Sequence, residues 1–308
     1  MKSGVGLQAV PRGPTLAIDL GKTACRVRVG VDEREAVGTA GLAERDGETR
    51  AIAAVERVLN DFPTAALESV GAVGIGAAGF EANPDAAAGF ARYVAQRIRA
   101  PTTITSDVVT AHVGALGGEP GTVLVAGTGS VAWNITTDSL VRRADGWGIW
   151  LGDDGSGRWI GRAGLAAALR AADGRGAATT LLQAATELAG SIDRLPKLIG
   201  GNAAPERRLA AFAPTVFAHA EAGDSVALSV FDEAIRHLAV TAAAVTVRGD
   251  TIAVLGGLLH NAAFAEQLGS ALADLGLQQV RPIGDALEGA AMIALRTDLP
   301  HERRLLRV

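Results

Sequence analysis

The sequence predicts an α/β fold made of two units, and three observations lead to this prediction. Segments with strand patterns alternate with segments of helical spacing along most of the chain, as in α/β proteins. An apolar strand, a tight glycine turn and a returning strand open both halves of the chain. The length of 308 residues is typical of two compact domains and is long for one core.

The first half alternates short apolar segments with amphipathic ones. The expected strands are residues 15–19, 25–31, 73–75 and 102–106. The expected helices are residues 51–62 and 84–99. A turn at Gly21 joins the first two strands, and Pro101 ends the second helix because proline cannot continue it.

The second half starts in the same way, after a cluster of glycine and proline at Leu116–Gly121 that marks the expected domain boundary. The expected strands are residues 121–126, 131–136, 251–255 and 280–283. The expected helical segments are an Ala- and Leu-rich region of about 159–248, then residues 264–275 and 286–295.

Composition excludes several classes of function. The formal charge of −4, with both signs mixed along the chain, gives no broad basic field for nucleic acid. Cys25 is the only cysteine, which excludes an intrachain disulfide and a cysteine-rich metal site. No apolar run is long enough to span a bilayer, and residues 1–14 lack the apolar core of a signal peptide. We therefore expect a cytoplasmic protein without nucleic-acid or membrane partners.

The segment Asp145–Gly157 is the most informative part of the chain, since it holds five glycines, three aspartates and two tryptophans. Glycine lets the backbone approach a ligand, tryptophan offers an apolar wall, and carboxylates accept hydrogen bonds from hydroxyl groups. A second glycine cluster, Gly127-Thr128-Gly129-Ser130, lies shortly before it. Together they predict a sugar-like ligand beside a phosphate.

The first glycine turn offers groups for phosphate and metal binding. Asp19 at a strand end can hold Mg²⁺ through water, because Mg²⁺ keeps several waters and takes few protein ligands. The turn at Gly21 presents backbone N–H groups, with Lys22 and Thr23 as side-chain donors. A P-loop is rejected because Leu16 stands where that motif requires glycine. An aspartate before an ordinary hairpin is the structural alternative.

Two further glycine segments suit a nucleotide. The turn Gly127–Ser130 follows an apolar strand, and two such hairpins facing each other could clamp phosphates from both sides. Gly256 and Gly257 would let the backbone lie flat against a base. The alternatives are a tight hairpin that needs positive φ and a turn that starts a helix.

Asp107 is the candidate for proton transfer. Phosphoryl transfer to an alcohol needs a carboxylate that accepts the hydroxyl proton, and Asp107 ends a strand just before an expected helix. A helix N-cap is the equally weighted alternative. The five histidines show no spacing suited to a metal site: His112, His219, His237, His260 and His301.

In this order, the motifs resemble the actin-like sugar-kinase superfamily, and within it the BadF-type ATPase group that contains N-acetylglucosamine and glucosamine kinases. The resemblance runs from about Leu16 to Leu295 and is most specific at Gly146–Gly157 and the following Arg158–Arg162. It implies two actin-like, ribonuclease H-like domains with an ATP and sugar cleft between them. The implied domains are residues 1–116, a larger helix-rich domain at 117–285, and a helix at 286–308 that returns to the first domain.

The resemblance also implies an ATP-dependent hexosamine kinase that acts on the sugar 6-hydroxyl, with Mg²⁺ and, as in many relatives, a homodimer. The implied catalytic base and sugar contact is Asp107. The implied metal-associated residue is Asp19. The implied phosphate contacts are Gly21, Lys22 and Thr23 in the first turn and Gly127, Thr128, Gly129 and Ser130 in the second. The implied sugar contacts are Gly146, Trp147 and Asp153, and the implied adenosine contacts are Gly256 and Gly257.

The chain departs from the resembled pattern at three places. Lys22 stands where close relatives often have glycine, and Asp154 stands where they usually have glutamate. Residues 38–42 lack the asparagine that N-acetylglucosamine kinases commonly place near the acetyl group. The third departure favours glucosamine or another hexose over N-acetylglucosamine.

Two alternatives stay open. A catalytically silent regulator that binds sugar or nucleotide would lack the base or a phosphate turn, and both are present here. A BadF-type activator ATPase carries an iron–sulfur cluster between subunits, and such clusters need cysteine ligands. A dimer of this chain supplies only two Cys25 thiols.

Overall fold

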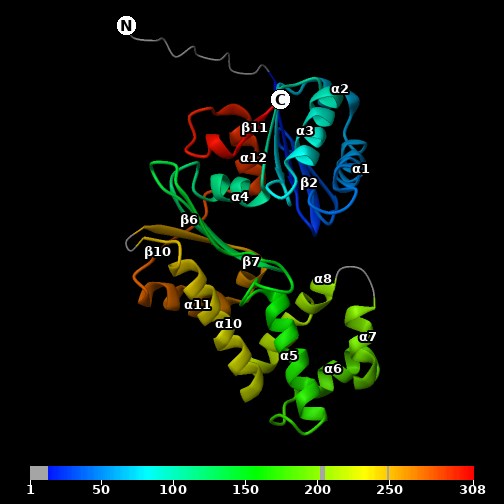
Figure 1. The fold of residues 1–308 in the computed structure, drawn as a ribbon, viewed down its shortest axis with the longest axis vertical. Coiled ribbons are helices and arrows are strands. Elements are labelled where there is room, and N and C mark those ends of the chain that lie inside the picture. The colour runs from blue at the N-terminus through cyan, green and yellow to red at the C-terminus, as the bar shows by residue number, and fades with distance from the viewer. Residues whose placement is uncertain (1–12, 202–204, 248–249) are drawn as a thin grey trace. The chain divides into compact units, whose positions relative to one another are not determined.

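The computed structural model describes residues 13–201, 205–247 and 250–308. These residues form two compact units, each with its own sheet (Figure 1). The first unit holds the chain up to Pro120, Ile135–Leu140 and Pro282–Val308, and the second unit holds Gly121–Asn134 and Val141–Arg281. The α/β class is therefore confirmed. Residues 1–12 of the expected first domain, and Arg248 at the end of the expected helical region, lie outside the described residues.

The sheet of the first unit has β1 near its middle. Its strand order is β11-β5-β4-β1-β2-β3, where β1 pairs antiparallel with β2 and parallel with β4. The strands are β1 (Thr15–Leu20), β2 (Ala24–Val29), β3 (Asp32–Val37), β4 (Ala72–Ala77), β5 (Thr102–Thr105) and β11 (Leu306–Arg307). The parallel arrangement of β1, β4 and β5 places the ends of β1 and β5, where Asp19 and Asp107 lie, at the same edge of this sheet.

Helices cover this sheet on both faces. They are α1 (Gly47–Leu59), α2 (Thr64–Glu68), α3 (Pro84–Ile98), α4 (Asp107–Ala115) and α12 (Ala286–Leu295), with a short 3-10 helix at Glu302–Arg304. Because side chains alternate along a strand, β1 packs Ile18 in one core with α1 and α3 and Ala17 in another with α12. Figure 1 shows α12 beside α4, although 170 residues separate the ends of these helices in the chain.

Glycines make the contact of α12 with its neighbours possible. A Cβ atom at Gly114 of α4 would lie 1.8 Å from the carbonyl oxygen of Asp285, and one at Gly289 of α12 would lie 1.8 Å from that of Thr110. These distances are far inside van der Waals contact, so the two helices can approach this closely only with glycine at both positions.

The sheet of the second unit repeats the strand order of the first. Its order is β10-β9-β6-β7-β8, which matches β5-β4-β1-β2-β3 strand for strand. The strands are β6 (Gly121–Ala126), β7 (Ser130–Ile135), β8 (Val141–Asp145), β9 (Thr251–Leu255) and β10 (Gln278–Val280). In both units a glycine turn therefore joins the first strand to the second, as the sequence predicts.

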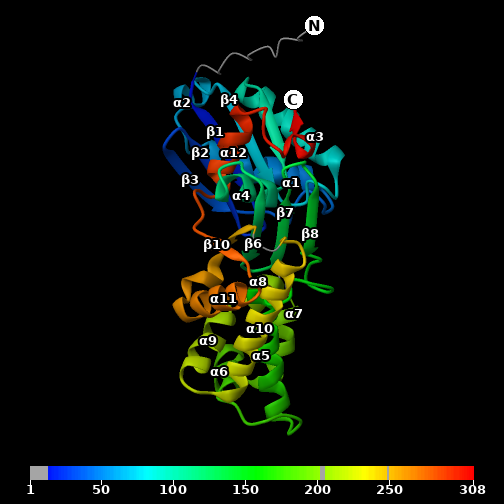
Figure 2. The same ribbon diagram turned by 90° about the vertical axis from the view of Figure 1, so that its left-hand side faces the viewer.

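The second unit is rich in helices, several of which pack together in Figure 2. They are α5 (Gly157–Ala172), α6 (Leu181–Ala189), α7 (Leu195–Gly200), α8 (Pro205–Ala210), α9 (Ala213–Glu221), α10 (Ser225–Ala243) and α11 (Ala262–Asp274), with 3-10 helices at Ile192–Arg194 and Gly257–His260. Phe217, Phe231 and Phe264 join α9, α10 and α11, with ring centroids 5.0–5.3 Å apart. These aromatic contacts fix the helices beside the pocket of this unit that is described below.

Most expected elements are confirmed, with small shifts at their ends. The strand expected at 280–283 lies at Gln278–Val280, and the strand expected to reach residue 31 ends at Val29. The expected helical region of about 159–248 is a succession of separate helices, and β3, β8, β11 and α2 were not predicted. No helix in the described part of the chain is long and apolar enough to cross a membrane.

Candidate functional site

The first glycine turn is a tight hairpin between β1 and β2. The amide of Gly21 donates to the carbonyl of Ala24 at 2.9 Å, and the segment after β3 closes over the turn. There, Gly38 N–H donates to the carbonyl of Thr23 at 3.0 Å and Thr39 N–H donates to that of Gly21 at 3.2 Å. The turn is therefore fixed by backbone hydrogen bonds, while Lys22 and Thr23 are exposed.

Asp19 lies at the end of β1, directly before this turn. Its Oδ2 accepts hydrogen bonds from Arg26 Nη2 at 2.8 Å and Nε at 3.3 Å. Burial raises the pKa of Asp19, and the Arg26 guanidinium opposes that rise. Arg26 also donates from Nη1 to Asp285 Oδ2 at 2.6 Å. The Arg26 guanidinium therefore links the carboxylates of Asp19 and Asp285.

Asp285 connects this network to the start of α12. Its Oδ1 accepts the amides of Leu287 at 2.9 Å and Glu288 at 3.2 Å, and Glu288 Oε2 accepts the amide of Asp285 at 2.9 Å. Burial works against ionisation of Asp285, but hydrogen bonds with Glu288 and Arg26 lower its pKa. Arg28 pairs with Glu288. The sequence analysis missed these residues, although arginine alternating with buried Cys25 and Val27 in β2 is a usable signal.

Asp107 is the first residue of α4, and Ser106 occupies the N-cap position. Its Oδ1 accepts the amide of Val108 at 2.9 Å, and the side chain is partly buried. Burial and the negative charge of Asp19 raise the pKa of Asp107 to about 6, against smaller effects of the Val108 amide and Lys22. The structure thus brings Asp19, Lys22 and Asp107 into one electrostatic neighbourhood.

Asp19 fits the ligand set expected for Mg²⁺. In the described residues, no group of three or more His, Cys, Asp or Glu side chains forms a cage that would hold a metal alone. Mg²⁺ uses one or two carboxylates and completes its shell with water and phosphate oxygens. Burial raises the pKa of both Asp19 and Asp107, and the charge of Asp19 adds to the rise at Asp107, so a bound cation would stabilise their ionised forms.

The second glycine turn is held by the start of α5. Gly127 N–H donates to the carbonyl of Gly129 at 3.0 Å, and the carbonyl of Gly127 accepts Gly157 N–H at 2.8 Å. Arg158 N–H donates to the carbonyl of Thr128 at 3.2 Å. The predicted phosphate turn therefore lies directly against the N-terminus of a helix of 16 residues, the end whose dipole favours anions.

Asp145 organises the segment before α5. Its Oδ1 accepts the amide of Asp153 at 2.7 Å, and its Oδ2 accepts the amide of Asp154 at 2.7 Å and the Ser130 hydroxyl at 3.3 Å. Ser130 also donates to the carbonyl of Asp154 at 2.9 Å. One carboxylate therefore ties the segment to the second glycine turn, a role that sequence analysis did not assign to Asp145.

Arg158, in the first turn of α5, binds the segment that precedes this helix, and only 3% of its surface is exposed. It donates to the carbonyls of Ile149, at 2.8 Å, and Gly152, and its Nε lies 3.8 Å from Asp153 Oδ2. A Cβ atom at Gly129 would lie 3.2 Å from the same carboxylate oxygen. The predicted sugar residue Asp153 is thus oriented by Arg158 and lies beside the second glycine turn.

Gly146 and Trp147 begin the same segment. Gly146 has a φ of 73°, a conformation that favours glycine, and its carbonyl accepts Arg143 Nη2 at 2.7 Å. The Arg143 guanidinium lies 4.7 Å from the centre of the Trp147 ring, while 67% of Trp147 is exposed. The ring is therefore held at the surface by a cation–π contact.

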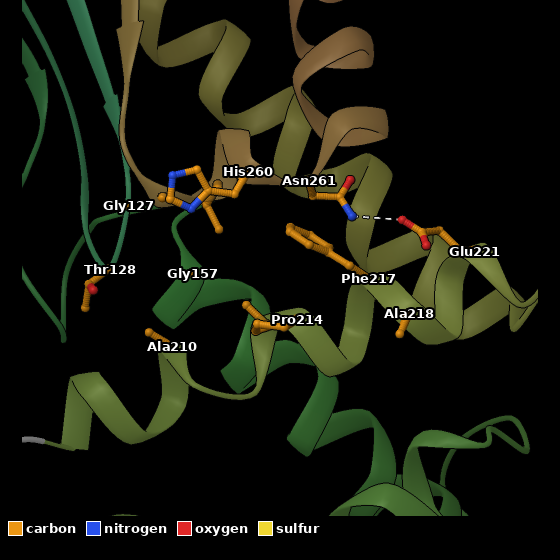
Figure 3. A pocket seen from close by; sticks show the side chains of 13 residues that line it. Gly127, Thr128, Gly157, Ala210, Pro214, Phe217, Ala218, Glu221, His260 and Asn261 are labelled. Atoms are coloured by element: carbon orange, nitrogen blue, oxygen red, sulfur yellow. Dashed lines mark hydrogen bonds between the residues drawn. The ribbon is translucent and has the colours of Figure 1, made fainter.

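A pocket of about 530 Å³ lies wholly within the second unit. Three predicted nucleotide residues line it, namely Gly127, Thr128 and Gly257, while Gly256 packs behind them against the end of β6. Most other lining residues come from α8 and α9, as Figure 3 shows. They are Gly157, Ala210, Ala213, Pro214, Phe217, Ala218, Glu221, Leu258, His260 and Asn261. Sequence analysis missed the α8 and α9 residues, since small and apolar side chains in a helical region carry no signal of a ligand.

A family profile and solved structures match nearly the whole chain. The profile of the BadF/BadG/BcrA/BcrD ATPase family matches residues 16–294. A protein of Chromobacterium violaceum, provisionally assigned as an N-acetylglucosamine kinase, has a similar structure with a TM-score of 0.73 and 26% identity, over 93% of this chain and 99% of that one. A protein of Porphyromonas gingivalis with the same provisional assignment shares the fold, with a TM-score of 0.66 and 16% identity over 94% and 99% of the two chains.

A shorter sequence match concerns the N-acetylmuramic acid/N-acetylglucosamine kinase of Clostridium acetobutylicum, which is 35% identical over 78 residues. This match spans 25% of the present chain and 26% of that relative. The actin-like fold expected from the motifs is confirmed by the solved structures. With a family profile that matches nearly its whole length, the chain belongs to the BadF/BadG/BcrA/BcrD ATPase family.

Proposed function

We propose that this chain is an ATP-dependent kinase that phosphorylates the 6-hydroxyl of an amino sugar, glucosamine or N-acetylglucosamine. The observation that carries the proposal is the Asp107 carboxylate, whose pKa of about 6 suits a general base near neutral pH. It shares its neighbourhood with Asp19 and Lys22 of the first glycine turn. The similarity to the Chromobacterium protein over nearly the full length of both chains supports the same activity.

In the proposed reaction Asp107 accepts the proton of the sugar hydroxyl. The hydroxyl oxygen forms a bond to the γ-phosphorus, the bond from that phosphorus to the β,γ-bridging oxygen breaks, and ADP leaves. Backbone amides of the glycine turns and Lys22 would position the phosphates, and Asp19 would hold Mg²⁺ through water. When bound, Mg²⁺ supplies positive charge that neutralises the phosphate oxygens.

ATP is the proposed co-substrate because the pocket of the second unit suits a nucleotide. The second glycine turn and the start of α5 offer a place for phosphates, and Gly257 borders the same pocket. Phe217 and Leu258 provide the apolar surface that a base requires.

The proposed sugar contacts are Gly146, Trp147 and Asp153. An exposed aromatic ring can cover the apolar face of a sugar, and a carboxylate accepts hydrogen bonds from its hydroxyl groups. Residues 38–42 lack the asparagine that N-acetylglucosamine kinases commonly place near the acetyl group, but Asn83 contacts this segment. Its Nδ2 donates to the carbonyl of Leu42 at 3.3 Å. However, Asn83 Oδ1 accepts the backbone N–H of Ala86 at 3.1 Å. Both the oxygen and the nitrogen of the Asn83 side chain therefore make hydrogen bonds within the protein.

The activator-type ATPase is less well supported. Cys25 is fully buried in β2, and burial together with the charge of Asp19 raises its pKa to about 12. A thiol held in its neutral form is a poor ligand for a cluster, because the thiolate is the metal ligand. The homodimer stays a prediction from the resemblance, and the cytoplasmic location stays a prediction from the composition.

The test is ADP release from Mg-ATP with glucosamine, N-acetylglucosamine, N-acetylmuramic acid, N-acetylmannosamine, glucose and a blank without sugar. Strong stimulation by one amino sugar is expected, and mass spectrometry of the product should locate the phosphate on the 6-hydroxyl. Hydrolysis that does not depend on sugar would support the activator-type ATPase. Saturable binding without turnover would support a silent regulator.

A further inference from the structure

The pocket of the second unit has a polar pair at its rim, formed by Glu221 at the end of α9 and Asn261 before α11. Asn261 Nδ2 donates to Glu221 Oε1 at 2.8 Å, and Asn261 Oδ1 accepts the amide of Phe264 at 2.8 Å. Because Oδ1 caps α11, the amide nitrogen must face Glu221. The orientation of this pair is therefore fixed by the helix.

The two ends of the pocket differ in chemistry. Gly127 and Thr128 lie at one end and the Glu221–Asn261 pair lies at the other, with Phe217 between them (Figure 3). The glycine end presents backbone at the N-terminus of α5 and suits phosphate. A carboxylate repels phosphate, so the Glu221 end suits the uncharged part of a nucleotide.

We propose that the Glu221–Asn261 pair recognises the 6-amino group of adenine, which makes Glu221 a specificity-determining residue; the inference rests on the proposed use of ATP. Asn261 occupies only Oε1 of the carboxylate, so Oε2 can accept an N–H of the base. The second amide hydrogen of Asn261 can donate to the neighbouring ring nitrogen. A 6-oxo purine would instead place an oxygen acceptor against the carboxylate, which is unfavourable.

Ribose hydroxyl groups are the other nucleotide donors that a carboxylate can accept, and the experiment separates them from the base. We would measure dissociation constants of Mg-ATP, Mg-ITP and Mg-2′-deoxyATP by calorimetry. ITP replaces the 6-amino group by an oxo group and adds a hydrogen to the neighbouring ring nitrogen, so it changes only this edge of the base, and 2′-deoxyATP changes only the ribose.

The decisive variant is Glu221→Gln, which keeps an oxygen for Asn261 and replaces the other carboxylate oxygen by an N–H donor. We expect the preference for ATP over ITP to fall about ten-fold, the usual effect of one charge-assisted hydrogen bond, with the ATP to 2′-deoxyATP ratio unchanged. Glu187→Gln is the matched control. Glu187 is an exposed carboxylate of α6 that accepts Gln183 Nε2 at 2.9 Å, and it does not line the pocket.

An unchanged ATP to ITP ratio in folded Glu221→Gln protein would overturn the proposal. A change confined to the ATP to 2′-deoxyATP ratio would also overturn it and assign Glu221 to the ribose. If the wild-type protein binds none of these nucleotides, this inference and the proposed kinase fail together. If ATP binds with the expected selectivity but no sugar stimulates ADP release, the inference stands and the proposed kinase fails.

Discussion

Asp107 is more basic than an ordinary aspartate, although it lies at the start of α4, where a backbone amide stabilises its charged form. The carboxylate is partly buried, and the nearby charge of Asp19 adds to the effect of burial on its pKa. The amide of Val108 stabilises the charged form but does not cancel these effects. An ordinary exposed aspartate has a pKa near 4 and is a much weaker base.

Replacing Asp107 by asparagine should remove the proton acceptor while keeping the size of the side chain. We expect Asp107→Asn to lower kcat at least about 100-fold, the usual contribution of a general base, and to change the dissociation constant of the sugar only a few-fold. Steady-state kinetics and equilibrium sugar binding would measure both. Retention of most of the activity would remove Asp107 from the proposed role.

The pH dependence of the reaction provides a second check on Asp107. Its pKa of about 6 means that the carboxylate is protonated below that pH and can no longer accept a proton. We expect kcat to fall about ten-fold for each pH unit below about 6. The residual activity of Asp107→Asn should not show this inflection, and its persistence in the variant would assign the ionisation to another group.

The site residues that sequence analysis found are those whose side-chain type already indicates their chemistry. Asp19 lies at the end of a strand, Asp107 follows one, and the turn at Gly127 needs glycine. Asp145 and Arg158 were missed as organisers because their partners are backbone groups several residues away. Such roles depend on how the chain folds back on itself, which spacing alone does not give.

At the scale of elements, glycine determines how closely α12 approaches α4. We expect Gly289→Ala to destabilise the protein by about 1–3 kcal/mol, because the added methyl group must separate two packed helices. Gly200→Ala is the control, since Gly200 ends α7 and has no described atom within 4 Å of an added Cβ. That change should be neutral or stabilising by up to about 1 kcal/mol. Urea unfolding would compare them, and equal stability of the two variants would contradict the packing argument.

The strands that sequence analysis missed lie at sheet edges or are very short. β3 carries the sequence Asp-Glu-Arg-Glu-Ala-Val and β8 carries Val-Arg-Arg-Ala-Asp, and both are the last strands of their sheets. An edge strand keeps charged side chains that discourage pairing with other chains, so it lacks the apolar pattern of an inner strand. β4, which is buried along its whole length, was found without difficulty.

At the scale of the whole molecule, a buried histidine pair makes the stability of the fold depend on pH in the acid range. One member of the pair, His301, lies in the C-terminal segment. His301 and His112 of α4 are both fully buried, with Nε2 of His301 2.9 Å from Nδ1 of His112. Burial and the neighbouring His112 lower the pKa of His301 to about 3. Below pH 6.5 the unfolded chain therefore binds a proton that the folded chain does not.

As the pH falls from about 6.5 to 3, this difference should reduce the free energy of unfolding by about 1.4 kcal/mol for each pH unit. Asp107 contributes with the opposite sign between about pH 6 and 4, because its raised pKa makes the folded state bind the proton more tightly. The comparison of wild type with His301→Gln isolates the histidine. A stability difference between the two proteins that does not change with pH would show that His301 titrates normally.

The repeated strand order was partly visible in the sequence. Both halves open with an apolar strand and a glycine turn, at Gly21 and at Gly127, and the sheets confirm that these turns occupy the same topological position. The return of residues 282–308 to the first unit was expected, as a helix at 286–308, only through the family resemblance. The contacts of α12 with β1 and β4 depend on long-range packing that no local pattern specifies.

The pocket proposed to bind the nucleotide draws all its lining residues from a single unit. A molecule that lacks phosphates can therefore still use the apolar wall and the polar rim. Adenosine itself should act as an inhibitor that competes with ATP, and added sugar should not relieve that inhibition. Binding of the bare nucleoside would then depend on the residues of α9 that line the pocket more than on the phosphate-binding glycine turns.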